Sequence, residues 1–364
     1  MIQEVKVADK QTLDEVKEIA DNLGDYLSSG CVAKVSVGED VIVDSSEFME
    51  WLPYSLLYGS AVVFNGEIHI LGSSSNSTAH YKWNGSSWVN VSTLPYNFYN
   101  GSAVILNNEI HILGSAEKAT SHYKWNGSNW SSVSTLPYQF YNGSAVVLNN
   151  EIHILGSASS GTYTKHYKWN GSNLVSVSTL PYDFCYGCAV VLNNEIHILG
   201  SGISGNKTKH YKWNGTSWVS VSTLPYDFYE GCAIVFNGKI HILGSNGDNE
   251  EPKSHYKYEN NNWVKCDDLP YNLLNGSAVV LNNEIHILGG SSAVGKESWY
   301  KLSSIYKNLL LYLFSGNSIS SKDTLYPLLN CTKDDDSGSL IVTEDGAVEF
   351  GVETQEDTAI INIS

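Results

Sequence analysis

Short apolar segments separated by polar turns repeat along most of the chain. The segment 101–106 is rich in Val and Ile, and after the pair Asn107–Asn108 a second apolar segment follows at 109–113. Two such segments joined by a two-residue Asn turn predict a β-hairpin. Two further strands are expected near 122–125 and 130–134. The pattern therefore predicts a four-stranded antiparallel meander.

The meander recurs six times. A Leu-Pro-Tyr marker stands near the start of each copy, and the intervals between markers are 42, 42, 44, 44 and 45 residues. The markers begin at Leu52, Leu94, Leu136, Leu180, Leu224 and Leu269. A fixed period of this length is typical of stacked supersecondary units. Six copies of a four-stranded meander predict an all-β, six-bladed β-propeller.

The repeat resembles the Kelch repeat over residues 45–302, because Tyr and Trp stand seven residues apart after the second apolar strand. The pairs with this spacing are Tyr81 and Trp88, Tyr123 and Trp130, Tyr211 and Trp218, and Tyr256 and Trp263. Tyr167 keeps the position, but Leu174 replaces the Trp, and the Gly-Gly doublet of the family is intact only at Gly289–Gly290. The resemblance implies the propeller fold. It leaves function open, because Kelch propellers include both enzymes and binding scaffolds.

The sixth unit lacks its fourth strand at the C-terminal end of the repeats. Five clear fourth strands precede residue 302, but residues 42–50 stand directly before Trp51, where a fourth strand belongs. We expect these residues to complete the sixth blade, since closure with both ends of the chain leaves no free sheet edge. The sequence thus predicts a propeller domain at 41–302.

The terminal segments 1–40 and 303–364 lie outside the repeat. A capping box at Thr12–Glu15 and a stripe of apolar residues predict a helix from Thr12 to Leu27. Asp345–Gly346 between two apolar runs predicts a hairpin.

Two stretches of these segments resemble structural tail proteins of phages of Gram-positive bacteria, namely Val5–Asp14 and Ser339–Gly346. The resemblance implies that the terminal segments join other virion proteins, or further copies of this chain. It also implies location in the virion, in the phage tail.

The net charge of −17 is concentrated in the terminal segments. Residues 1–50 hold 12 acidic residues and 4 lysines, and residues 303–364 hold 10 acidic residues and 3 lysines. A propeller without a basic face is not expected to bind nucleic acid. No apolar run of about 18 residues or secretory signal is present in the sequence, so membrane insertion and secretion are not expected. All 21 basic residues are lysines, which excludes a sialidase-like arginine cluster.

The histidines and cysteines could serve metal binding, redox chemistry or packing. All eleven histidines occupy repeat positions, one in each second strand and one at the start of five third strands. A catalytic metal needs a local cluster, so a structural role is expected. Cys185 and Cys188 form a C-x-x-C pair in the positions that Tyr99 and Ser102 occupy in blade 2, which favours packing. Metal binding remains the alternative for both sets and for the acidic loop 334–336, but no cofactor or metal is expected.

One face of the propeller differs between otherwise similar blades. The turns between first and second and between third and fourth strands are nearly constant, whereas the second–third and fourth–first loops diverge in length and content. Function on a rigid scaffold is commonly carried by such loops. The candidate ligand-binding residues in these loops are Tyr58, Tyr99, Asn100, Tyr141, Asn142, Tyr186, Tyr229, Glu230 and Asn275.

Tyrosine rings and asparagine amides suit sugars, because rings stack on apolar sugar faces and amides hydrogen-bond hydroxyls. The sequence favours a non-enzymatic recognition protein, a phage tail or fibre component that binds a bacterial surface glycan or protein. The alternatives are a Kelch-type carbohydrate mutarotase or lyase that uses the central pocket, and a purely structural virion spacer.

Overall fold

The computed structural model describes residues 5–7, 31–37, 41–246, 252–290, 297–315, 318–319, 338–342, 347–352 and 359–362. The chain divides into two compact units, one of residues 46–302 and one of residues 1–45 with 303–364. Within the described ranges every regular element is a strand, and none is a helix that could span a membrane. The helix expected over residues 12–27 lies outside the described residues.

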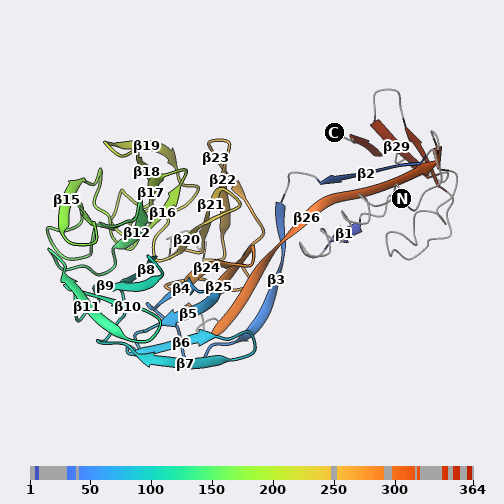
Figure 1. Ribbon diagram of the computed structural model, residues 1–364. Coiled ribbons are helices and arrows are strands. Elements are labelled where there is room, and N and C mark those ends of the chain that lie inside the picture. Colours follow the sequence, from blue (N-terminus) through green and yellow to red (C-terminus); the bar gives the residue numbers. More distant parts are fainter. Residues whose placement is uncertain are drawn as a thin grey trace. The chain divides into compact units, whose positions relative to one another are not determined.

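Residues 46–302 form six antiparallel blades (Figure 1). The strands of blades 1 to 5 are, in order, β4 (Ser60–Phe64), β5 (Glu67–Leu71), β6 (Ala79–Trp83) and β7 (Trp88–Thr93); β8 (Ser102–Leu106), β9 (Glu109–Leu113), β10 (Ser121–Trp125) and β11 (Trp130–Thr135); β12 (Ser144–Leu148), β13 (Glu151–Leu155), β14 (Lys165–Trp169) and β15 (Leu174–Thr179); β16 (Cys188–Leu192), β17 (Glu195–Leu199), β18 (Lys209–Trp213) and β19 (Trp218–Thr223); and β20 (Cys232–Phe236), β21 (Lys239–Leu243), β22 (His255–Glu259) and β23 (Asn262–Lys265). The first strands of neighbouring blades contact one another in a closed circle from β4 through β24 and back to β4. The predicted six-bladed propeller is confirmed.

Blade 6 is completed by the N-terminal side of the chain. Its strands are β24 (Ser277–Leu281), β25 (Glu284–Leu288), the start of β26 (Ser298–Ser315) and the end of β3 (Val41–Trp51), which pairs with β26. The backbone N–H of Leu52 donates to the Glu297 carbonyl at 2.7 Å. The ring of Phe48 lies edge-on to Tyr300, with centroids 5.4 Å apart. The predicted closure by an N-terminal strand is confirmed.

Removing this strand should open the ring. We expect a chain of residues 51–302 to be less stable than one of residues 46–302, because β26 loses its backbone partner and the packing of Met49 against blade 6. The loss should be about 3 kcal/mol, which lowers the melting temperature by roughly 10 °C. The exposed edge should also promote aggregation. Equal melting of the two chains would contradict this role for β3.

The residues that the structure describes in the unit of 1–45 and 303–364 are also β-strands. Here β2 (Cys31–Val37) pairs antiparallel with β26, with Val35 opposite Leu311. Strands β28 (Gly338–Val342) and β29 (Ala347–Val352) form the hairpin predicted around Asp345–Gly346. The remaining strands of this unit are β1 (Val5–Val7), β27 (Ser318–Ile319) and β30 (Ala359–Asn362). The predicted small C-terminal β unit is confirmed.

The turns of the blades have the predicted chemistry. Asn107 and Asn108 have φ angles of 50° and 58°, as a type I′ hairpin requires. In the turn between third and fourth strands, Oδ1 of Asn126 accepts hydrogen bonds from the backbone N–H groups of Ser128 and Asn129, both at 3.0 Å. The Asn-Gly-Ser sequences of the repeats thus serve as turns.

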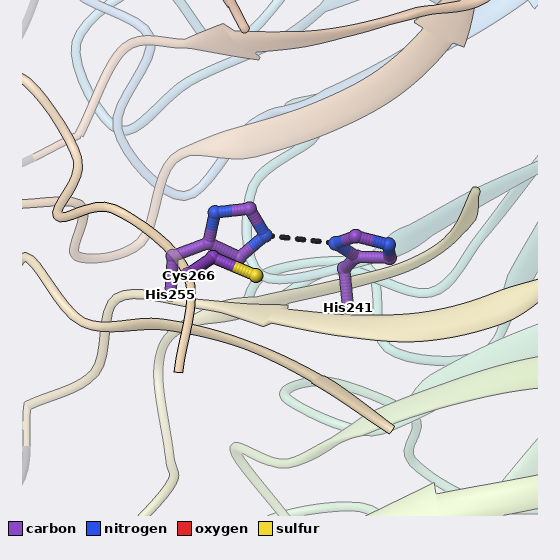
Figure 2. Close-up of side chains that lie close together, drawn as sticks. All are labelled: His241, His255 and Cys266. Carbon is purple, nitrogen blue, oxygen red and sulfur yellow. Dashed lines mark hydrogen bonds between the residues drawn. The ribbon is translucent and has the colours of Figure 1, made fainter. Parts of the chain in front are cut away.

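The histidines form hydrogen-bonded pairs inside the blades. In blades 1 to 5, Nδ1 of the second-strand histidine lies 2.8 to 2.9 Å from Nε2 of the third-strand histidine, as for His241 and His255 in blade 5 (Figure 2). In blade 6, Trp299 takes the third-strand position, and its indole N–H donates to Nδ1 of His286 at 3.0 Å. An indole nitrogen only donates, so His286 accepts at Nδ1 and carries its proton on Nε2. The repeat indicates the same tautomer in the other blades.

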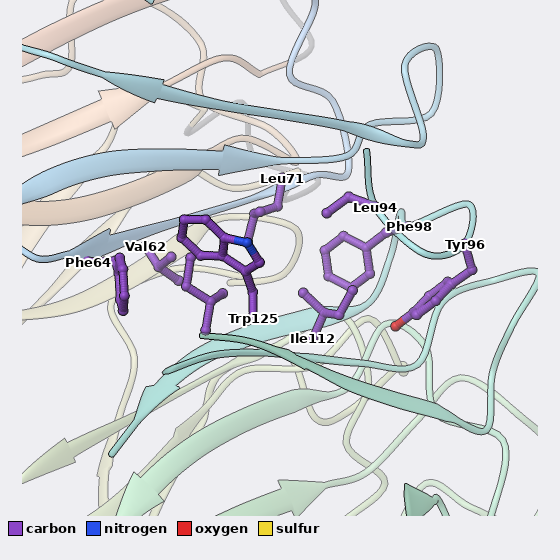
Figure 3. Close-up of a cluster of buried hydrophobic side chains, with 9 residues drawn as sticks. Val62, Phe64, Leu71, Leu94, Tyr96, Phe98, Ile112 and Trp125 are labelled. Carbon is purple, nitrogen blue, oxygen red and sulfur yellow. The ribbon is translucent and has the colours of Figure 1, made fainter. Parts of the chain in front are cut away.

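The core lies between adjacent blades. Phe64 and Leu71 of blade 1 pack against Ile112 and Trp125 of blade 2 together with Phe98 from the connecting loop (Figure 3). The cluster has nine buried residues, so each interface supplies several side chains worth about 1.5–3 kcal/mol each. Leu94 and Tyr96 of the Leu-Pro-Tyr marker belong to this core, whereas Pro95 is exposed.

In blades 1 to 5, two hydroxyl groups fix the loop that enters the blade, as in blade 2. The Tyr96 hydroxyl donates to the carbonyl of Gly114 at 3.1 Å. Oγ of Ser115, in the second position of the Gly-Gly doublet, donates to the carbonyl of Asn97 at 2.6 Å. The Ser that departs from the Kelch pattern therefore makes a buried hydrogen bond that a Gly would lack.

The C-x-x-C pair consists of two separate free thiols. Sγ of Cys188 donates to the carbonyl of Gly231 in blade 5 at 3.2 Å. Burial raises the pKa of Cys185 to about 11 and that of Cys188 to about 12, so both groups stay protonated at neutral pH. These contacts agree with the packing role expected from the repeat.

Candidate functional site

Six residues in the left-handed backbone region surround the centre of the propeller. Each stands at the same position of its blade, directly before the glycine that leads into the first strand. The residues and their φ angles are Tyr58 (61°), Asn100 (57°), Asn142 (51°), Tyr186 (57°), Glu230 (57°) and Asn275 (54°). We call this set the axial ring; all six belong to the candidate set predicted from the sequence.

The backbone of the axial ring closes on itself through hydrogen bonds. The N–H of Asn100 donates to the carbonyl of Tyr58 at 2.8 Å, and each following residue donates to the one before it at 2.7 Å. Tyr58 closes the circle by donating to Asn275 at 2.9 Å. Because every link joins two blades, the ring holds the six side chains in fixed relative positions.

The axial ring surrounds an open hollow of about 140 Å³. The hollow is lined by the six ring residues and the six glycines that follow them. Amide, phenol and carboxylate groups line it, and no lysine does so. The arrangement suits a small polar group that offers several hydrogen-bond donors.

Three members of the axial ring occupy a costly conformation. Asparagine tolerates the left-handed region well, and it is the residue in blades 2, 3 and 6. Tyr58, Tyr186 and Glu230 adopt the same φ without that tolerance, at about 1 kcal/mol each. Asparagine would relieve this backbone strain, so the strained residues indicate that their side chains have a function.

The side chains of the three strained residues interact electrostatically. Burial, followed by the negative charge of Glu230, raises the pKa of Tyr58 above its ordinary value. Burial is also the main cause of the raised pKa of Tyr186, to which Cys185, Glu230, Tyr141 and Tyr58 add. Both phenols therefore remain hydrogen-bond donors at neutral pH beside one carboxylate.

The loops between second and third strands support these side chains. Nδ2 of Asn246 donates to the Glu230 carboxylate at 2.9 Å. At the equivalent position of blade 4, a Cβ on Gly202 would come within 3.0 Å of the Tyr186 ring, so glycine leaves room for the ring. Asn246 and Gly202 were not singled out from the sequence. The signal was present, since the residue after each Gly-Ser pair varies between blades: Ser74, Ala116, Ala158, Gly202 and Asn246.

The other three predicted site residues, Tyr99, Tyr141 and Tyr229, do not line the hollow. Each precedes its ring residue by one position and is partly buried. The hydroxyl of Tyr99 donates to Glu117 at 3.1 Å, and the ammonium of Lys207 lies 5.0 Å from the centre of the Tyr229 ring. The predicted set therefore divides into the axial ring and a group of three tyrosines outside the lining.

Comparison with known proteins supports the fold. No family model matches the sequence, and no curated protein matches it. The chain is similar to the solved structure of a protein named YjhT, with 15% sequence identity and a TM-score of 0.59, over 73% of this chain and 99% of that one. Identity at this level shows the propeller fold alone, so the Kelch and phage-tail resemblances stay predictions.

Proposed function

We propose that the protein is a non-enzymatic recognition protein whose axial hollow binds a polar group of a bacterial surface glycan or protein. The observation that carries this is the presence of Tyr58, Tyr186 and Glu230 in strained positions where the other three blades carry asparagine. Two phenols and a carboxylate accept and donate hydrogen bonds to sugar hydroxyls or amines, and the rings offer apolar faces to a sugar.

The setting we propose is a phage tail or fibre. It rests on the resemblance of the terminal segments to phage tail proteins, with the virion as location. In this setting the propeller contacts the host surface, and the terminal segments join other tail proteins or further copies of the chain.

The chain offers its own conservative replacements for a test. Tyr58→Asn, Tyr186→Asn and Glu230→Asn each introduce the residue that blades 2, 3 and 6 carry. We expect the triple variant to melt at an equal or higher temperature, because the strain is relieved. Each replacement should weaken binding about thirtyfold, as removal of an interface residue worth about 2 kcal/mol does. A glycan array and bacterial-cell binding, followed by titration with the ligand found, measure this.

The matched control lies on the opposite face. Asn108→Gly turns the Asn-Asn hairpin of blade 2 into the Asn-Gly hairpin of blades 1 and 5, and should leave binding unchanged. Full binding by a folded triple variant would contradict a site in the axial hollow. Equal loss in the triple variant and the control would mean that destabilisation caused the loss.

An enzyme that uses the same hollow is the second candidate. A carboxylate and two phenols in one hollow are groups that general acid–base catalysis uses. Incubation with the sugars found on the array, followed by NMR of their anomeric and elimination products, separates the two functions. The recognition proposal expects no conversion above the uncatalysed rate.

A further inference from the structure

Blade 5 departs from the other blades at its histidine pair. In blades 1 to 4, Nδ1 of the third-strand histidine lies 2.7 to 2.9 Å from the hydroxyl of a fourth-strand serine. The pairs are His80 with Ser92, His122 with Ser134, His166 with Ser178, and His210 with Ser222. In blade 5 the residue opposite His255 is Cys266, whose backbone N–H donates to the His255 carbonyl at 2.8 Å.

A change of register brings the cysteine there. In blade 4 a bulge between His210 and Tyr211 places Ser222 opposite His210. The pairing of β22 with β23 has no such shift. His255 therefore faces Cys266, which stands one residue before the position equivalent to Ser222. The hydroxyl that pairs with Nδ1 in the other blades is thus missing, and the Cys266 thiol lies on the side of the His255 ring that faces His241.

The replacement leaves a buried polar atom without a partner. His255 is fully buried, and its Nδ1 has no hydrogen-bond partner. An unpaired polar atom in such a place costs about 1–3 kcal/mol, which a serine would have avoided. The packing of the blade therefore does not explain why cysteine stands here.

Three potential metal ligands meet at this point. Within the part of the chain that the structure describes, His241, His255 and Cys266 form the one group of three or more His, Cys, Asp or Glu residues whose ligand atoms all lie within 4.8 Å of one another. Figure 2 shows the Cys266 sulfur beside the His255 ring, on the side that faces His241. The group is small enough for one ion to contact all three after modest side-chain rotation.

We infer that His241, His255 and Cys266 form a three-coordinate site for a soft monovalent ion, Cu⁺. Thiolate and imidazole are ligands that Cu⁺ prefers. As the Cu–S bond forms, the thiol releases its proton to solvent, so two neutral imidazoles, one thiolate and Cu⁺ carry no net charge. Neutrality matters because both histidines are buried and uncompensated charge beside them is costly.

The number of ligands favours Cu⁺ over Zn²⁺. Structural Zn²⁺ takes four ligands, whereas this group supplies three. The neighbouring charges have both signs: Lys257 acts on all three ligands and Lys239 on His241, whereas Glu259 acts on His241 and Cys266, and Asp267 acts on Cys266.

Both imidazoles are neutral before the ion binds, but Nδ1 of His241 and Nε2 of His255 share one proton in their hydrogen bond of 2.8 Å. Cu⁺ takes the place of this proton between the two rings, and His255 then carries its proton on Nδ1, the atom that has no partner. Burial lowers the pKa of His241 to about 4 and that of His255 to about 3, so both rings are neutral at pH 7. Burial raises the pKa of Cys266 to about 11. The ion must therefore displace the thiol proton, which makes binding weaker at lower pH.

The test is an anaerobic titration of the full-length protein with Cu⁺ against a chromogenic Cu⁺ chelator. We expect one tightly held ion per chain. Cys266→Ser should weaken binding at least about a hundredfold, since loss of a mere supporting residue already costs 10–100-fold. This variant should stay folded, because the exchange of sulfur for oxygen at a half-buried position leaves the backbone hydrogen bond from Cys266 to His255 in place.

Cys188→Ser is the matched control, because serine already occupies that position in blades 1, 2, 3 and 6. It should bind Cu⁺ as the unchanged protein does, and X-ray absorption of both should show two nitrogen ligands and one sulfur ligand. The inference is overturned if the chelator removes all the Cu⁺, if Cys266→Ser binds equally well, or if the site takes Zn²⁺ in preference to Cu⁺.

Discussion

Lowering the pH from about 7.5 to about 5 should unfold the propeller cooperatively, well above the range in which carboxylates titrate. The cause is the set of buried histidines in blades 1 to 4. Burial, modified by neighbouring charges, lowers the pKa of the second-strand residues to about 4; these are His69, His111, His153 and His197. It lowers the pKa of the third-strand residues to about 3; these are His80, His122, His166 and His210.

The sign follows from proton binding. Because these pKa values lie below the unfolded value of 6.5, the unfolded chain binds more protons than the folded one at any pH between about 4 and 6.5. The stability is full above pH 6.5 and decreases as the pH falls below it. Eight histidines together change the free energy of unfolding by about 11 kcal/mol per pH unit in that window. This is comparable to the whole stability of a typical domain, so unfolding should occur within about one unit below pH 6.5.

Urea unfolding at a series of pH values measures this slope. His122→Gln is the informative variant, because an amide N–H can still donate to His111 but the side chain does not titrate. It should reduce the slope by one proton, about 1.4 kcal/mol per pH unit. A free energy of unfolding that stays constant between about pH 7 and about pH 5.5 would refute the burial of these histidines as neutral groups.

Gly114→Ala should be among the most damaging small substitutions in the propeller, with a loss of about 4 kcal/mol or more. Gly114 has a φ of +60°, and a Cβ there would lie 1.9 Å from the backbone carbonyl oxygen of Phe140 in the next loop. Neither backbone segment can move away without separating blades 2 and 3. The same close approach, at 1.8 to 2.2 Å, occurs at Gly72, Gly156, Gly200, Gly244 and Gly289.

The control separates close contact from backbone strain. Gly127 also has a positive φ, +98°, but nothing lies within 4 Å of a Cβ built there. Gly127→Ala should therefore cost only the backbone term, about 1–2 kcal/mol. Thermal unfolding of both variants gives the comparison, and equal shifts in melting temperature would show that the approach of the two backbones is not limiting.

The two positions of the Gly-Gly doublet differ in what they can accommodate. The first glycine of the doublet is kept in all six blades because only a residue without Cβ fits against the next blade. The second position has no such restriction in blades 1 to 5, and serine there gains a buried hydrogen bond, as Ser115 does with Asn97.

The sequence by itself determined the six blades, their hairpin turns and the closing strand. These features depend on local patterns: apolar strands of five or six residues, Asn-Asn and Asn-Gly turns, and a marker every 42 to 45 residues. Each pattern is complete within one repeat. The strand that completes blade 6 follows from the count of five fourth strands for six blades. The divergent face was also visible, because near-identical copies could be compared position by position.

Only the tertiary structure decided which divergent positions act together. Tyr58, Tyr186 and Glu230 lie in different blades, and the circle of backbone hydrogen bonds that gathers them joins Tyr58 to Asn275. Strain at these residues depends on φ, which tyrosine and glutamate do not signal in a sequence. Likewise, Cys266 faces His255 because β23 lacks a bulge that β19 has. Local patterns specify strands, but contacts between blades and register within them arise only when the ring closes.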